Sequence, residues 1–212
     1  MIDEVTKKMK HLSRYTSITD LLCMLQSKKL HFSNPEGWED RTDAAFLKKY
    51  EETEKKKVRV LCFSDVYDKH HFWKIYAKHG CMIKFDREKL FNKIKENNNN
   101  LRFKEVKHIR PKYFRKNKKD LPFIKQFGYE KEKEYRLVWK GDNVKDAFIP
   151  LDLEAIEEII ISGDIKKELV ENLKEIVYKI TDEQIAKEKI THSKIYENEE
   201  WIKEINSTIF NP

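Results

Sequence analysis

The chain has 212 residues, with 44 Lys and Arg against 37 Asp and Glu, and a formal net charge of +7. This length suits one domain with a small addition. Charged residues make up 38% of the chain and hydrophobic ones only 39%, yet 12% are aromatic, and there are only five glycines and five prolines. Disordered chains lack aromatic and β-branched residues, because they cannot bury enough apolar surface to offset the entropy of ordering. The composition therefore excludes a disordered chain.

The sequence also predicts the cellular compartment of the protein. No run approaches the ~18 apolar residues of a membrane-spanning helix, and the amino-terminal MIDEVTKKMKHL lacks the apolar core of a signal peptide. We therefore predict a cytoplasmic protein without a membrane partner. Cys23, Cys62 and Cys81 are odd in number and lie in apolar segments, which predicts buried, reduced thiols. The positive charge is spread among many acidic residues, so it permits an anionic partner without requiring one.

The first third of the chain alternates short strands with helices. Residues 12–17 are expected to be extended, and Ser17 with Asp20 forms an imperfect capping box for a helix that begins at residue 18. A strand at 30–33 is followed by a turn at 34–40. A charged helix is predicted at 43–57 and a buried strand at 58–64.

A second helix with an apolar stripe is predicted at 69–79. Trp73, Tyr76 and Ala77 fall on one face, and Gly80 suits the position after a helix end. We expect the Trp73 and Tyr76 side chains to be mostly buried. Further along, strands are predicted at 81–86, 101–109, 134–140 and within 155–163, with a helix at 87–96 and two helices at about 164–178 and 181–206.

Short strands interleaved with helices, without the regular alternation of a parallel sheet, predict a mixed α+β fold. We expect a core at residues 1–165 and a helical appendage at 166–212, which together form a single domain. The five glycines are isolated, and no GxGxxG or GKS/GKT motif occurs. This argues against the Rossmann and P-loop classes.

An acidic alternation precedes and enters the predicted strand at 134–140. It places Glu132, Glu134 and Arg136 on one face. Two interpretations stay open. Lys131 and Lys133 could compensate the like charges on a solvated strand flank. Alternatively, the paired carboxylates could hold a ribose hydroxyl and stabilise a cationic sugar carbon, as in glycoside cleavage.

Metal binding is not expected from the histidines. His70, His71 and His79 lie near Cys81, but their spacing matches no standard zinc site. A hydrolase with a divalent ion held by Asp40, Glu132 and Glu134 nevertheless stays open as one hypothesis, because Mg²⁺ binds to a few carboxylates together with water.

Four sequence blocks occur in a fixed order: LSRYTS, LHFSNPEGWED, LCFSD with HFWKIYAKHGCMIKFD, and YEKEKEYRLV. In this order they resemble a bacterial domain-of-unknown-function family, number 2971, over about residues 12–165. Members carry an R-Y-T segment, an F-S-x-P turn, a W-x-x-Y-A-x-x-G block and an E-x-E-(W/Y)-R-L strand. Glu39-Asp40 stands here where members usually have Asn-Asp. The resemblance names a family but no activity.

The chain is also similar to mono-ADP-ribosyltransferases, which include DNA-modifying toxins. Arg14 falls where these proteins have a first-strand Arg, and Ser64 matches their serine strand, although the Ser-Thr-Ser triplet is absent. Glu132-x-Glu134 matches their acidic pair. The resemblance implies an ADP-ribosyltransferase-like split sheet and an NAD-dependent transferase of the kind found in toxins and phage-defence effectors.

The resemblance also implies roles for individual residues. Glu134 would stabilise positive charge at the anomeric carbon as nicotinamide departs, Glu132 would orient or deprotonate the acceptor, and Arg136 lies beside them. NAD would be the substrate, and no metal is needed. The residues expected to hold NAD are Arg14, Tyr15, Thr16, Ser33, Ser64, Trp73 and Tyr76.

A basic and aromatic stretch at 107–129 suits a nucleic-acid acceptor. Lys112, Arg115 and Lys118 would attract phosphates, and aromatic side chains would stack on bases. A protein acceptor is the alternative. The same stretch supports a competing hypothesis, a non-catalytic module that binds nucleic acid or nucleotides. The sequence does not predict an oligomeric state.

Overall fold

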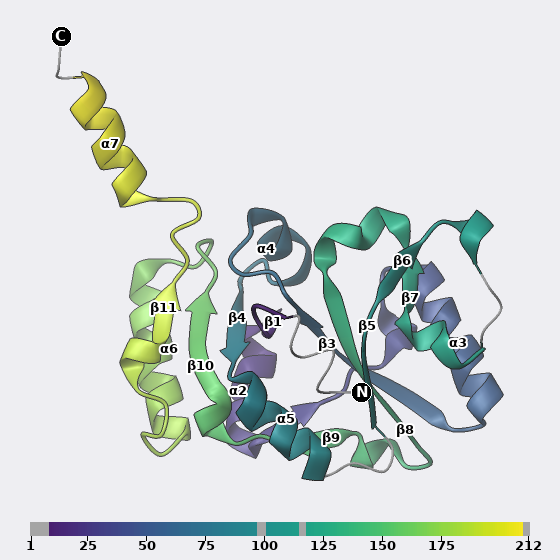
Figure 1. Ribbon diagram of the computed structural model, residues 1–212. Coiled ribbons are helices and arrows are strands. Elements are labelled where there is room, and N and C mark those ends of the chain that lie inside the picture. The colour runs from purple at the N-terminus through teal and green to yellow at the C-terminus, as the bar shows by residue number, and fades with distance from the viewer. Residues whose placement is uncertain (1–8, 97–100, 115–117, 210–212) are drawn as a thin grey trace.

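The computed structural model describes residues 9–96, 101–114 and 118–209. Its centre is a seven-stranded sheet in the order β11-β10-β4-β1-β3-β8-β5 (Figure 1). β10 and β11 are parallel, and the other neighbours are antiparallel. The strands are β1 (Ser13–Ser17), β3 (Lys57–Ser64), β4 (Gly80–Phe85), β5 (Leu101–Glu105), β8 (Glu134–Gly141), β10 (Ile156–Ile161) and β11 (Ile190–His192).

Helices and two small sheets surround this main sheet. The helices are α2 (Ile18–Ser27), α3 (Arg41–Glu54), α4 (His70–Tyr76), α5 (Arg87–Glu96), α6 (Lys167–Ile180) and α7 (Glu199–Ile209). The small sheets pair β2 (Lys29–His31) with β9 (Phe148–Pro150) and β6 (Lys107–Ile109) with β7 (Ile124–Gln126). Short 3-10 helices include Pro35–Gly37, Pro111–Tyr113, Lys118–Phe123 and Phe127–Glu132. The predicted mixed fold of strands and flanking helices is confirmed.

One face of the main sheet carries the largest apolar core. Successive residues of a strand point to opposite sides, so Leu61 and Phe63 of β3 and Tyr135 and Leu137 of β8 share this face. Helices α2, α5 and α6 cover it. Their buried side chains include Leu21, Leu25, Leu90, Phe91, Val170 and Val177.

The opposite face is covered in two separate places. α3 packs on β3 and β8, and α4 packs on β4 and β10, each through its own apolar cluster (Figure 1). The first cluster includes Leu47, Tyr50, Val58, Val60 and Val138, and the second contains Trp73, Ala77, Met82 and Ile160. Between α3 and α4, the polar side chains on this face of the main sheet are not covered by apolar side chains.

The main sheet splits between β1 and β3. β1 pairs with β4 along its whole length, but within the described residues it pairs with β3 through Ser13 and Ser64 alone. Beyond this pair the strands separate, and Arg14 Nη1 donates to the Cys62 carbonyl oxygen across the gap at 3.2 Å. Farther along the same edge of β3, Ser33 forms an isolated bridge. The predicted split sheet is therefore present.

Local capping explains where the first two helices begin. The Ser17 hydroxyl accepts a hydrogen bond from Asp20 N at 3.0 Å, which caps α2 as predicted. Asp40 caps α3 in the same way, so this helix begins at Arg41, two residues before its predicted start.

The role predicted for Gly80 is wrong. Helix α4 ends at Tyr76, and Gly80 begins β4 instead of terminating the helix. A Cβ atom at Gly80 would lie 2.2 Å from the Thr16 carbonyl oxygen. Glycine is therefore required here by the close approach of β1, and not by a helix end.

The second of the two predicted C-terminal helices is also wrong. Residues 181–206 contain strand β11, which extends the main sheet beside β10, and α7 begins only at Glu199. Figure 1 shows α7 standing away from the rest of the molecule. The division into a core and an appendage at residue 165 stays a prediction, and a strand from beyond that point belongs to the sheet.

Two composition-based predictions can be compared with the structure. No helix among the described residues is long and apolar enough to cross a membrane. Cys81 is buried and Cys62 is half-buried, but Cys23 is exposed, so the predicted burial is wrong for Cys23. Burial raises the pKa of the Cys81 and Cys62 thiols, which are therefore protonated at neutral pH.

Candidate ligand-binding pocket

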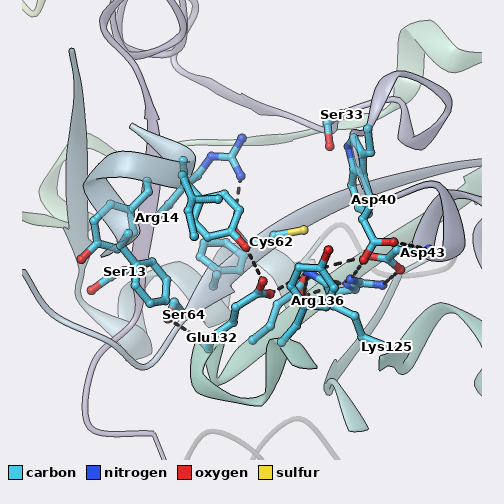
Figure 2. A pocket seen from close by; sticks show the side chains of 18 of the residues that line it. Ser13, Arg14, Ser33, Asp40, Asp43, Cys62, Ser64, Lys125, Glu132 and Arg136 are labelled. Carbon is cyan, nitrogen blue, oxygen red and sulfur yellow. Dashed lines mark hydrogen bonds and ion pairs between the residues drawn. The ribbon is translucent and has the colours of Figure 1, made fainter. Parts of the chain in front are cut away.

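A pocket lies over the split in the sheet, between α3 and α4. Its volume of about 430 Å³ is in the range of small-molecule sites. Figure 2 shows Ser13, Arg14 and Ser64 on one side and Ser33, Asp40 and Asp43 on the other, with Cys62 and Glu132 between them. The remaining lining residues are Tyr15, Trp38, Glu39, Phe63, Phe72, Ile75, Tyr76, Lys125, Tyr129, Glu134 and Arg136.

The floor of the pocket is the polar face of β3 and β8. Cys62 pairs with Arg136 and Ser64 pairs with Glu134, so all four side chains point to the same side. The sequence placed Glu132, Glu134 and Arg136 on one strand face; this is confirmed for Glu134 and Arg136 but is wrong for Glu132, which precedes the strand. Glu134 and Arg136 are buried, so the interpretation as a solvated strand flank is wrong. Glu132 lies in the 3-10 helix before the strand and enters the pocket from the side.

Arg136 is fully buried between two carboxylates. Its Nη1 and Nη2 donate to the two oxygens of Asp43 at 2.8 and 2.5 Å, and its Nε and Nη2 donate to those of Glu134 at 2.6 and 3.0 Å. The planar guanidinium matches such paired contacts. Burial alone would lower the pKa of Arg136, but Glu134 and Asp43 outweigh it and raise the pKa, so Arg136 stays charged.

Lys125 is the second cation of this cluster. Its Nζ donates to Glu132 Oε2 at 2.6 Å and to Glu134 Oε2 at 3.3 Å, and lies 3.8 Å from Asp43 Oδ2. Burial would lower the pKa of Lys125, but the two glutamates outweigh it and raise the pKa. Three carboxylates thus share two buried cations.

The three carboxylates differ in their pKa. Burial acts to raise the pKa of Glu134, but Arg136 and Lys125 outweigh it and lower the pKa to about 2. Burial prevails at Asp43 and Glu132 and raises the pKa of each, although Arg136 and Lys125 act against it. Glu134 is therefore the carboxylate held most firmly in its ionised form.

The Tyr76 hydroxyl donates a hydrogen bond to Glu132 Oε1 and so connects α4 with the 3-10 helix across the pocket. Trp73 is fully buried, as predicted, but 39% of Tyr76 is exposed. The predicted burial of Tyr76 is wrong because this side of α4 forms a wall of the pocket instead of packing on the core.

Two residues predicted to hold NAD do not line the pocket. The Trp73 ring is enclosed in the cluster under α4, and its Nε1 donates to Asp68 Oδ1 at 2.7 Å. It has no face free for stacking, so that predicted role is wrong. Thr16 is buried, and its hydroxyl donates to Asp20 Oδ2 at 3.2 Å.

The other residues predicted to hold NAD come together in the pocket. Arg14, Tyr15, Ser33, Ser64 and Tyr76 all line it. The Ser33 hydroxyl donates to the Val60 carbonyl oxygen, and that of Ser64 donates to the Glu132 carbonyl oxygen. Burial lowers the pKa of Arg14, although nearby Cys62 and Asp20 oppose this. A guanidinium nevertheless stays protonated in proteins.

Three polar atoms of the pocket lining are buried without a hydrogen-bond partner. They are Ser13 Oγ, the Tyr15 hydroxyl and Asp40 Oδ2. A buried polar atom usually finds a partner, because losing water without one is costly. The Tyr129 hydroxyl lies beside Asp40 and the backbone amides of Asp68 and Lys69 lie beside the Tyr15 hydroxyl, so Ser13 Oγ is the atom of the three for which a ligand could best supply the hydrogen bond.

Asp43 and Lys125 belong to the buried cluster but were not among the predicted site residues. Asp43 lies in the first turn of α3, where an acid is common on helix-dipole grounds alone. Lys125 lies in a basic stretch and looks like a surface cation in the sequence. Their pairing depends on contacts distant in the chain, which no local pattern reveals.

The basic stretch at 107–129 carries exposed rings, each beside a cation. Arg110 lies over Phe127 at 4.6 Å, Lys112 over Tyr113 at 4.9 Å, and Lys125 over Tyr129 at 4.6 Å. The rings are Tyr113, Phe127 and Tyr129, all at least 37% exposed. Of the predicted phosphate contacts, Lys112 is exposed, Lys118 begins a 3-10 helix, and Arg115 lies outside the described residues.

Among the described residues, no group of three or more His, Cys, Asp or Glu is arranged to hold a metal ion. Asp40, Glu132 and Glu134, the ligands of the hydrolase hypothesis, therefore do not form such a group. Glu132 and Glu134 are instead paired with Lys125.

No family model matches the chain, and neither does any curated protein. The resemblance to family 2971 stays a prediction. Solved structures similar to this chain include those of DarT from Thermus sp. 2.9 in complex with carba-NAD+, with NAD+ and with ADP-ribosylated ssDNA. In each case the identity is 14%, and 87% of this chain is covered. The shares of the DarT chain covered are 95%, 96% and 94%, and the TM-scores are 0.44, 0.46 and 0.47.

Proposed function

We propose that the pocket binds an NAD-type dinucleotide and that the protein is an NAD-dependent ADP-ribosyltransferase. The observation that carries the proposal is the state of Glu134, an ionised carboxylate on the pocket floor with a pKa lowered to about 2. A fixed negative charge in a site with little water stabilises a developing cation more strongly than water does. Cleavage of the bond between nicotinamide and ribose creates such a cation at the anomeric carbon.

In the proposed reaction, the carbon–nitrogen bond to nicotinamide breaks, and its electron pair goes to the nicotinamide nitrogen, which becomes neutral. Glu134 stabilises the positive charge left on the sugar. The acceptor then forms a bond to the anomeric carbon and loses a proton to Glu132. Burial raises the pKa of Glu132 above that of an ordinary glutamate, which makes its carboxylate a stronger base.

Arg14 and Tyr76 have supporting roles in the proposed reaction. Arg14 lies on the Ser13 side of the pocket and is suited to a phosphate or ribose of the dinucleotide. The Tyr76 hydroxyl donates a hydrogen bond to Glu132 and holds the Glu132 carboxylate at the pocket wall.

The acceptor is proposed to be a nucleic acid, with a protein as the alternative. The exposed rings of the 107–129 stretch support a nucleic acid, since bases stack on exposed rings and the exposed cations Arg110 and Lys112 beside two of them attract phosphates. The same rings favour the second candidate function, a non-catalytic module that binds nucleic acid.

Nicotinamide release from NAD tests the proposal, measured for the purified protein with water, oligonucleotides or proteins as acceptors. Glu132→Gln should reduce transfer to an acceptor more than hydrolysis, because Glu132 is proposed to orient and deprotonate the acceptor, whereas an attacking water can also release its proton to solvent. Glu130→Gln is the matched control, since Glu130 is exposed in the same 3-10 helix. If the wild-type protein releases no nicotinamide with any acceptor but binds oligonucleotides, the binding module is the better assignment.

A further inference from the structure

The chain returns to α4 after strand β11, through the segment of residues 193–196. The Ser193 hydroxyl donates a hydrogen bond to Asp68 Oδ1 at 2.8 Å, and the indole Nε1 of Trp73 donates to the same oxygen at 2.7 Å. Asp68 lies in the loop before α4 and has a φ of 42°, a left-handed conformation that aspartate tolerates. One carboxylate oxygen therefore joins the 193–196 segment to α4.

Two further residues of the 193–196 segment pack on α4. Ile195 adds to the apolar cluster under the helix. The Tyr196 ring lies edge-on to His70 with the ring centres 5.5 Å apart, and Lys74 Nζ lies 5.0 Å from the centre of the Tyr196 ring. On its other side, the ring lies so close to Gly163 that a Cβ atom there would be 2.7 Å from it. Tyr196 is thus fixed between α4 and the turn after β10.

Helix α4 needs such contacts because it is short. It has seven residues, and the side chain of Lys69, at the position before the helix, does not cap it. A helix of this length is unstable without tertiary packing. From β1, the Tyr15 ring contacts Phe72 and Trp73, with ring centres 4.8 and 5.2 Å apart. The 193–196 segment supports the helix from the other side of the chain, far away in sequence.

We propose that Ser193 and Tyr196 are positioning residues that hold α4 where Tyr76, its last residue, reaches Glu132. The Tyr76 hydroxyl donates to Glu132 Oε1, so a shift of α4 withdraws this bond and lets the carboxylate turn away from its direction in the pocket. The consequence for transfer rests on the proposed function, in which Glu132 orients the acceptor, and alignment of reacting groups strongly affects rate. The support of α4 itself does not rest on that function.

Three variants separate the contacts. Tyr196→Ala removes the ring, and Ser193→Ala removes the donor to Asp68. Tyr196→Phe keeps the ring and should behave like the wild-type protein. Tyr178→Ala is the matched control, because Lys187 lies over the Tyr178 ring at 4.9 Å in a similar contact, but Tyr178 belongs to α6 on the opposite face of the sheet.

Hydrogen–deuterium exchange of the full-length protein, followed by mass spectrometry, measures the support of α4 without ligand or turnover. In Tyr196→Ala and Ser193→Ala, the amides of residues 70–76 should exchange about tenfold faster than in the wild-type protein, because local opening of α4 then breaks fewer contacts. Exchange in α3 should stay unchanged, which shows that the effect is local. Tyr196→Phe and Tyr178→Ala should leave the exchange of residues 70–76 unchanged.

A double-mutant cycle tests the route through Tyr76, with nicotinamide release as the assay. Tyr76→Phe and Tyr196→Ala should each reduce transfer to an acceptor more than hydrolysis. Combined, they should reduce transfer no further than Tyr76→Phe alone, because residues that act through the same contact are not additive. Additive losses would overturn the assignment of Tyr196 as a residue that positions Tyr76.

The exchange data decide the inference by themselves. Unchanged exchange of residues 70–76 in both alanine variants would overturn it, and so would faster exchange in α3 to the same extent, because the variants would then destabilise the whole protein. If the wild-type protein releases no nicotinamide but the exchange of α4 responds as expected, the proposed transferase activity fails and the positioning of α4 stands. Release of nicotinamide with unchanged exchange gives the reverse result.

Discussion

Glu134→Gln is the most informative single substitution for the buried cluster of charges. In the sequence it looks almost harmless, because glutamine has the same size and still forms hydrogen bonds. The structure predicts a measurable loss of stability. Glu134 accepts two hydrogen bonds from Arg136 at 2.6 and 3.0 Å and one from Lys125 at 3.3 Å, and glutamine would turn these charge-assisted bonds into weaker neutral ones.

The size of the loss follows from what remains after the substitution. Removing one partner of a buried ion pair costs about 3–5 kcal/mol when the other charge is left alone. Here Arg136 keeps both bonds to Asp43, and Lys125 keeps its bond to Glu132. After the substitution, the cations Arg136 and Lys125 are paired with the carboxylates Asp43 and Glu132. We therefore expect a smaller cost for Glu134→Gln, about 1.5–3 kcal/mol, the worth of hydrogen bonds to a charged group.

Arg136→Gln provides the contrast. It leaves Asp43 and Glu134 buried side by side with Lys125 as their remaining cation, so its cost should reach about 3–5 kcal/mol or prevent folding. Urea unfolding followed by circular dichroism measures both variants. Glu52→Gln is the control, since its ion pair with Lys49 is exposed and should contribute nothing measurable. Equal stability of wild type and Glu134→Gln would refute the reasoning.

The pH dependence of stability provides a second measurement on the same variant. The folded-state pKa of Glu134 is about 2, below the ~4.3 of an unfolded glutamate. Between these values the unfolded chain binds more protons, so the contribution of Glu134 is present above about pH 4.3 and is lost as the pH falls towards 2. Wild-type protein should therefore lose more stability than Glu134→Gln on acidification through this window. Parallel curves would show that folding does not lower the pKa of Glu134.

Further predictions concern other parts of the molecule. Gly80→Ala should lower the melting temperature by several degrees, because its Cβ would lie 2.2 Å from the Thr16 carbonyl oxygen, while Gly128→Ala, with nothing within 4 Å, should not. Trp73→Phe should cost about 1–3 kcal/mol in urea unfolding, because it removes the buried hydrogen bond to Asp68; a neutral effect would contradict the packing of α4. Lys112→Gln should weaken oligonucleotide binding and reduce the slope of log affinity against log salt by about 0.7, and an unchanged slope would mean that Lys112 contacts no phosphate.

The sequence predicted those parts of the fold that have a local physical cause. The capping of α2 by Ser17 and the shared face of Glu134 and Arg136 depend on residues a few positions apart, and both predictions are confirmed. Tyr76 was predicted on the correct helix but with the wrong environment. Its spacing is the same whether its neighbour is the core or a pocket wall, so only the packing of α4 decides.

The parts that failed depend on distant partners. Residues 181–206 have the composition of a helix, but Ile190 and its neighbours form β11 because they lie beside β10. Asp43 and Lys125 could not be predicted as site residues from their neighbours in the sequence, since their ion-pair partners lie on other elements.

Because β1 and β3 are paired only at one end, the distance between these two strands, which sets the width of the pocket, can change without breaking a strand ladder. At one end the two halves are joined by the Ser13–Ser64 pair and by Asp65, which accepts from the amides of Lys10 and His11. Beyond that point, the bond from Arg14 to Cys62 spans the gap. Widening the pocket therefore breaks the hydrogen bonds from Arg14 to Cys62 and from Tyr76 to Glu132, with the Ser13 end as the pivot. Breaking few hydrogen bonds costs little free energy of local opening, so the pocket can adjust to ligands of different thickness.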